Sequence, residues 1–222
     1  MKCFADAYCK KKNESYCSEL CGAYRVLRAL YNLSRLPDRY RYNIVLEAKN
    51  QEDLTAFMAL NDYKENVLEK VKAGEGLYIW GKSTGCGKTS WACKIMSHYF
   101  RKIAFSTGLE NEGLYIFLPT FLEDIRRSYD SEDQDFEQVL SMVENCNLLI
   151  VDDIGAEKVT DWVAERVVSL IHRRYSNGLC TIYTSNLSPE ELKEKMGERV
   201  ASRVLGSSKV IEISGGDWRQ DR

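Results

Sequence analysis

Short apolar runs alternate with amphipathic stretches along most of the chain. Five runs have the length and composition of buried strands, at residues 76–80, 114–118, 148–153, 180–186 and 209–213. Helical spacing of apolar residues lies between or beside them, at about 88–100, 119–127, 160–175, 189–196 and 197–205. Strands that alternate with helices in this way predict an α/β fold, with a parallel sheet flanked by helices on both faces.

Two further helices are expected before the first strand. Apolar residues recur at helical spacing within 18–34, and Pro37 ends that helix. The second helix covers about 53–72 and is ended by Gly74. We therefore expect a small helical N-terminal module, residues 1–46, and one larger domain, residues 47–222.

Charge is divided unevenly between these two parts. The chain has 222 residues, of which 44% are hydrophobic and 29% charged, and its net charge is −2. Residues 1–46 carry a surplus of five positive charges, whereas the remainder carries a surplus of seven negative charges. This asymmetry favours two modules with different partners, although a solvated lysine-rich surface gives the same pattern. Since no apolar run approaches the ~20 residues that cross a bilayer, we expect a cytoplasmic protein without a membrane partner.

Cysteines cluster in the basic N-terminal segment. Four of the eight, Cys3, Cys9, Cys17 and Cys21, lie within 19 residues. In a reducing compartment such a cluster favours metal over disulfides, and four thiolates suit tetrahedral zinc. The spacings differ from the usual pairs of cysteines two residues apart, so unliganded thiols and an iron–sulfur cluster remain alternatives.

A glycine-rich stretch, GKSTGCGKTS at 81–90, follows the first strand and opens a helix. It resembles the phosphate-binding pattern G-x-x-x-x-G-K-[ST], except that Lys82 stands where the first glycine is expected. Lys88 is expected to reach the β- and γ-phosphates, and the Thr89 hydroxyl to bind Mg²⁺. A glycine turn that happens to precede a lysine is the alternative. The expected nucleotide contacts are Gly81, Ser83, Thr84, Gly85, Cys86, Gly87, Lys88, Thr89 and Ser90.

Polar residues end two later strands. Asp152 and Asp153 follow a continuous apolar run, and Asn186 ends the next strand. Because ligands of parallel sheets bind at the carboxyl ends of the strands, we expect Asp152 to support Mg²⁺ and Asp153 to orient or deprotonate water. Asn186 is expected to contact the γ-phosphate or that water, although a turn-forming role is an alternative.

With these motifs in place, the chain resembles AAA+ ATPases, and more narrowly the bacterial and phage helicase loaders of the DnaC and DnaI type. The stretches that carry the resemblance are GLYIWGKSTGCGKTS, LLIVDDIGAEKVTDW, RRYSNGLCTIYTSNLSPEEL and GERVASRV. They span residues 76–204 almost continuously. Transposition-helper ATPases share much of this pattern and are the nearest rival family.

The resemblance implies roles for three arginines. Arg203, or else Arg199, would project into the ATP site of a neighbouring subunit, and Arg219 would sense nucleotide within its own chain. Only 36 residues follow Asn186, so a truncated lid is expected. Subunit contacts would then complete the site, which implies a homo-oligomer in the ATP state.

The resemblance also implies a function. The chain would be an ATPase, slow and stimulated by DNA or a partner, that binds a replicative DNA helicase through residues 1–46 and single-stranded DNA through its ATPase domain. Hydrolysis would release the helicase. Three alternatives remain: a transposition helper that recruits a transposase, a small-molecule kinase, and an assembly factor that binds ATP without hydrolysing it.

Overall fold

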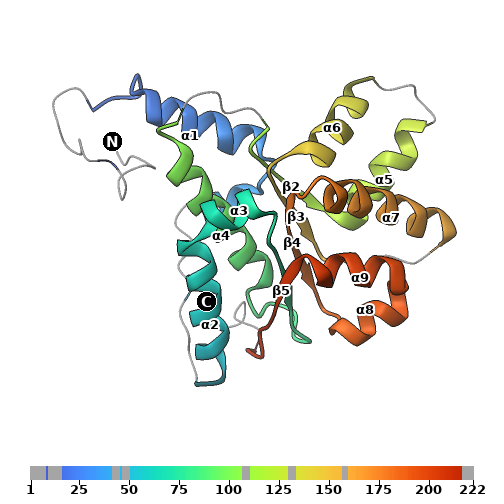
Figure 1. The fold of residues 1–222 in the computed structure, drawn as a ribbon. Coiled ribbons are helices and arrows are strands. Elements are labelled where there is room, and N and C mark those ends of the chain that lie inside the picture. The colour runs from blue at the N-terminus through green and yellow to red at the C-terminus, as the bar shows by residue number, and fades with distance from the viewer. Residues whose placement is uncertain are drawn as a thin grey trace.

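The sheet is parallel throughout. The computed structural model of the chain describes residues 9, 17–41, 46, 51–106, 111–129, 134–156 and 160–216. Within them, five strands pair in the order β2-β3-β4-β1-β5 (Figure 1). The strands are β1 (Gly76–Trp80), β2 (Gly113–Phe117), β3 (Leu148–Asp152), β4 (Cys180–Ser185) and β5 (Ser208–Glu212). Each begins and ends within one residue of its predicted bounds, so the predicted α/β fold is confirmed.

Helices cover both faces of this sheet, and each face has its own apolar core. Because side chains alternate along a strand, Leu148 and Ile150 of β3 enter one core, whereas Leu149 and Val151 enter the other. The first core is covered by α1 (Gly22–Leu33), α2 (Gln51–Glu65), α3 (Val67–Ala73) and α4 (Lys88–Ile103). The second is covered by α5 (Leu118–Tyr129), α6 (Gln134–Asn145), α7 (Asp161–Ser176), α8 (Pro189–Met196) and α9 (Glu198–Gly206). Figure 1 shows these two groups on opposite sides of the strands.

Two helical features differ from the sequence prediction. Helix α6 was not predicted, although Phe136, Val139, Leu140 and Val143 have helical spacing and pack in the second core. The helix predicted over 53–72 is divided at Asn66, whose side-chain amide donates to the backbone and the carboxylate of Asp62. Such local bonds of asparagine compete with the helical ladder, which accounts for the break.

The N-terminal helix shares its core with the main domain. Leu27 and Tyr31 of α1 are fully buried, and the Tyr31 ring meets Phe100 of α4 edge-on at 5.6 Å. The carbonyl of Ser34 accepts a hydrogen bond of 2.8 Å from the Tyr115 backbone in β2. A short 3₁₀ helix, η1 (Asp38–Tyr40), follows. The boundary predicted at residue 46 therefore does not separate two cores, and a distinct task for residues 1–46 remains a proposal.

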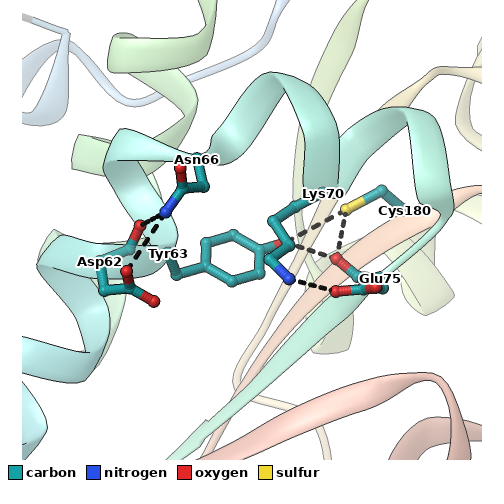
Figure 2. A network of polar contacts seen from close by, with 6 residues as sticks. All are labelled: Asp62, Tyr63, Asn66, Lys70, Glu75 and Cys180. Atoms are coloured by element: carbon teal, nitrogen blue, oxygen red, sulfur yellow. Dashed lines mark hydrogen bonds and ion pairs between the residues drawn. The ribbon is translucent and has the colours of Figure 1, made fainter.

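A polar network joins α2 to the amino edge of the sheet (Figure 2). The Tyr63 hydroxyl donates to the Glu75 carbonyl at 2.6 Å, and the Cys180 thiol lies 3.4 Å from that hydroxyl. Burial raises the pKa of the Cys180 thiol to about 11, so the thiol stays protonated. These residues adjoin a surface pocket of about 460 Å³ at the amino ends of β1, β4 and β5, away from the glycine loop.

A buried arginine connects the second core to the sheet. Arg174 of α7 is 1% exposed, and its guanidinium donates to the Thr181 hydroxyl and to the carbonyls of Val143, Cys146 and Cys180 at 2.6–2.9 Å. These four bonds join α7 to β4 and to the turn that leads from α6 into β3. Only the planar, five-donor guanidinium can serve so many acceptors from one position.

We predict that Arg174→Met lowers the free energy of unfolding by about 3 kcal/mol, because buried carbonyls lose their donors. Arg173→Met is the matched control, since Arg173 is the exposed neighbour and its ion pair with Glu144 lies partly in solvent. That change should cost less than ~1 kcal/mol. Urea unfolding of both variants measures the difference, and equal midpoints would contradict the assignment.

Candidate functional site: a nucleotide-binding edge of the sheet

The predicted site residues gather at the carboxyl edge of the sheet, where β1 lies between β4 and β5. From β1 the chain enters the glycine loop and α4, then crosses to β2 at the far edge. Such a reversal of strand order is the usual ligand site of open parallel sheets.

Among the described residues, no helix is long and apolar enough to span a bilayer.

Gly81 is required by a close approach of two chain segments. A Cβ at this position would lie 2.3 Å from the carbonyl oxygen of Ile213, just beyond β5. Backbone hydrogen bonds fix that approach, from Ile213 to Trp80 at 2.7 Å and from Gly81 to Ser185 at 3.2 Å. Strand packing therefore explains why the first glycine of the motif is Gly81, one position earlier than usual. Lys82, which occupies the usual position of that glycine, is exposed and forms an ion pair with Glu191 of α8.

The rest of the loop leaves the first backbone N–H groups of α4 without a side-chain cap. Gly85 and Gly87 have φ of +81° and +99°, a region that favours glycine. Gly87 is the N-cap of α4 and has no side chain to occupy the first N–H groups of the helix. Those groups are suited to an anion. Ser83, Ser90 and Gly87 are partly exposed, Thr84 is exposed and Cys86 is buried.

Lys88 is held inside the loop. Its ammonium donates to the carbonyls of Gly81 and Ser83, each at 2.9 Å, and to the Cys86 sulfur at 3.4 Å. The residue is 8% exposed. The positive charge therefore lies within the curve of the loop, where phosphate oxygens would be bound.

Three side chains of the site donate hydrogen bonds to the Asp152 carboxylate. One oxygen accepts from the hydroxyls of Thr89 at 2.8 Å and Thr184 at 2.6 Å, and the other accepts from Tyr115 at 2.7 Å. A carboxylate adjacent to a hydroxyl is the hard oxygen donor set that Mg²⁺ prefers. Thr89 and Asp152 therefore fit the metal that the sequence predicts.

Asp153 has a different environment from its neighbour. Its φ is +63°, which is uncommon for a residue with a side chain, and its N–H donates to the Thr184 hydroxyl at 2.9 Å. The Asn186 amide donates to its carboxylate at 3.1 Å. Burial, and then the charge of Asp152, raises the pKa of Asp153, whereas Lys88 and Lys195 act in the opposite direction. Asn186 thus contacts the carboxylate of Asp153, and its expected contact with the γ-phosphate or the water remains a prediction.

Tyr115 and Thr184 were missed by the sequence analysis. Each lies on a strand adjacent to β3, so only the pairing of strands reveals that both reach Asp152. Burial, followed by the Asp152 charge, raises the pKa of Tyr115, and its hydroxyl remains a donor. For Thr184 the sequence signal was a polar residue near the end of the strand that follows the Asp152 strand along the chain.

Two of the three predicted arginines lie on α9, away from the glycine loop. Arg199 and Arg203 are on α9, where the Arg203 guanidinium donates to the Arg199 carbonyl at 2.9 Å and to His172 of α7 at 3.3 Å. Arg199 is exposed. A role in a neighbouring subunit thus remains a proposal. Arg219 lies outside the described residues.

The predicted zinc site finds no support. Cys9, Cys17 and Cys21 are free thiols, and the described part of the chain contains no group of three or more metal-ligating side chains. Cys3, the fourth predicted ligand, lies outside that part.

Comparison with known proteins decides the family. A model of the AFG1-like ATPase family matches residues 28–222. The chain belongs to that family. With the sheet order and the glycine loop, this confirms the AAA+ ATPase resemblance, and the family implies a nucleotide together with Mg²⁺.

Helicase loaders are among the similar proteins. The replicative helicase loader DnaI of Bacillus subtilis is 31% identical over 75% of this chain and 54% of its own length. The loader DnaC of Escherichia coli K12 is 24% identical over 64% of this chain and 56% of its own. A crystal structure of the DnaC helicase loader superposes with a TM-score of 0.68 at 25% identity, covering 80% of this chain and 100% of that one. The chain thus spans about half the length of the curated relatives it matches.

We predict that Gly81→Ala lowers the free energy of unfolding by ~1–3 kcal/mol and weakens nucleotide binding, because the added methyl displaces the Ile213 backbone. Gly206→Ala in α9 is the matched control, since a Cβ there meets no atom within 4 Å. Thermal unfolding and titration with a fluorescent ATP analogue measure both effects. Equal behaviour of the two variants would refute the packing role.

Proposed function

We propose that the chain is an ATP-hydrolysing switch that loads a replicative helicase onto single-stranded DNA. The observation that carries this proposal is the Thr89–Asp152 hydrogen bond beside Lys88, in a fold shared with DnaC. The names of the similar loaders support helicase loading. Nothing in the site or in the relatives named above favours the transposition-helper alternative.

The residues of the site suit phosphate chemistry. Lys88 and the N–H groups at the start of α4 would bind the phosphates, while Thr89 and Asp152 would hold Mg²⁺, which neutralises charge on the phosphate oxygens when bound. Asp153 would orient the attacking water, and Asn186 holds the carboxylate of Asp153 in place. Both catalytic carboxylates then lie at the end of the same strand.

Hydrolysis by one subunit alone should be slow. Asp153 has a shorter side chain than glutamate, and its carboxylate is bonded to Asn186. An additional positive group would stabilise the charge that develops on the transferred phosphoryl group. We propose that Arg203 of a neighbouring subunit supplies it in an ATP-dependent homo-oligomer, so that assembly on DNA stimulates the reaction.

The basic N-terminal segment is the proposed helicase-docking region. The surplus of five positive charges in residues 1–46 suits an acidic protein surface. Most of this surplus comes from arginines after residue 21, and Arg25 and Arg28 are exposed on α1, whose other face packs in the apolar core. Docking is therefore proposed for residues 1–46, including the exposed face of α1. Action on replicating bacterial or phage DNA would place the protein in the cytoplasm.

We predict that Lys88→Ala and Asp152→Asn each lower kcat for ATP by at least about 100-fold, as loss of a preorganised electrostatic contact does. Lys82→Ala is the matched control, because Lys82 lies in the same loop but is exposed and contacts Glu191. It should retain at least about half of the activity. Phosphate release with and without single-stranded DNA measures this, and equal rates in all variants would rule out the site.

A second prediction tests docking in the full chain. Reversing the charge of Lys10, Lys11 and Lys12 to Glu should weaken binding to the replicative helicase of the same host at least about tenfold, since charge complementarity is lost. Intrinsic ATPase activity should persist. Interferometry with immobilised helicase measures binding, with a transposase as the competing partner. Unchanged helicase affinity, or preference for the transposase, would contradict the proposal.

A further inference from the structure

The edge between α7 and α9 holds a histidine against the proposed trans-acting arginine. The guanidinium of Arg203 uses two of its nitrogens: Nη1 donates to the Arg199 carbonyl at 2.9 Å, and Nε donates to Nδ1 of His172 at 3.3 Å. The Arg199 contact lies within α9, whereas the His172 contact comes from a different helix. Two anchors on separate nitrogens fix the plane of the group, and neither of them uses Nη2.

The chemistry of the contact defines the state of the imidazole. A guanidinium has donors and no acceptor, so Nδ1 of His172 must accept and the ring proton must lie on Nε2. A doubly protonated ring would offer no acceptor and would repel the arginine. Ser176, one turn along α7, places its hydroxyl 3.4 Å from the same Nδ1 and can donate to it, which favours the same tautomer.

The packing beneath these residues keeps the two helices in register. Val167 and Ile171 of α7 and Val200 and Val204 of α9 are buried in the second core. His172 therefore lies at the solvent edge of a packed helix pair, next to Arg203 and outside the ATP site of its own chain. A histidine in this place is not required for core packing, because its side chain is exposed.

We propose that His172 is a positioning residue that holds Arg203 ready to enter the ATP site of the neighbouring subunit. This inference rests on the proposed ATPase function and on Arg203 as the residue supplied in trans. An unrestrained arginine side chain must lose rotamer freedom before it can contact the transferred phosphoryl group. The His172 contact removes part of that loss in advance, so it acts on the transition state and not on ATP binding.

The test is steady-state ATP hydrolysis with single-stranded DNA at saturation. His172→Ala should lower kcat on the order of tenfold with an unchanged KM for ATP, as expected for an interaction realised only in the transition state. His172→Asn should recover most of that loss, because its amide oxygen occupies about the position of Nδ1. His172→Gln, which places its oxygen further out, should not. A loss shared equally by the Asn and Gln variants would overturn the proposal.

Mixed oligomers test whether the effect crosses the subunit boundary. Lys88→Ala subunits lack a working loop but carry an intact His172–Arg203 pair, and His172→Ala subunits have the reverse defect. The mixture should exceed the summed activity of the two variants several-fold. No gain would mean that His172 acts within its own subunit, and this would overturn the proposal.

The Arg203→Ala variant separates the proposed trans role of Arg203 from the proposed role of His172. If it is fully active, the proposed trans role of Arg203 fails, whereas an inactive Arg203→Ala beside a normal His172→Ala refutes only the role of His172.

Discussion

One carboxylate, that of Asp152, must be satisfied by hydrogen bonds because it is 5% exposed and lies at the end of a strand buried on both faces. The three donors come from three other elements: Thr89 from α4, Tyr115 from β2 and Thr184 from β4. Satisfying the charge therefore fixes two strands and the start of a helix relative to β3. The same contacts place a hydroxyl beside a carboxylate at the mouth of the glycine loop, so the requirement that stabilises the fold also shapes the metal site.

A second constraint acts at the start of the loop, where β1, β4 and β5 end together. Gly81 is there because the chain after β5 passes too close for any side chain. The neighbouring residue, Lys82, is exposed and forms an ion pair with Glu191 of α8. The sequence departs from the usual motif because its first glycine lies at position 81, where the packing of the strands requires it. Gly85 and Gly87 keep the left-handed conformations that the loop needs.

How far the sequence could predict this structure depends on the range of each interaction. Strands were located within one residue because runs such as LLIVD are long, apolar and bounded by polar residues. Tyr115 and Thr184 were missed because their role exists only once strands distant in sequence are paired. The separate N-terminal module was inferred from surface charge, which carries no information about the buried face of α1. The motif residues Lys88, Thr89, Asp152 and Asn186 could be predicted because each lies at or just after the end of an apolar run that reads as a strand, and their roles remain predictions.

The elements after β4 connect Asp152, which belongs to the subunit's own ATP site, with Arg203, which is proposed to act in the ATP site of a neighbouring subunit. Thr184, the last residue but one of β4, donates to Asp152 at 2.6 Å, and Ser185, the last residue, donates to the Ile154 carbonyl at 2.7 Å. Further on, Lys195 at the end of α8 contacts the Gly155 carbonyl, and α9 with Arg203 follows directly. These contacts join the segment after β4 to the turn that follows Asp152. Helix α8 thus lies, along the chain, between the residues of a subunit's own ATP site and the arginine that is proposed to complete the site of its neighbour.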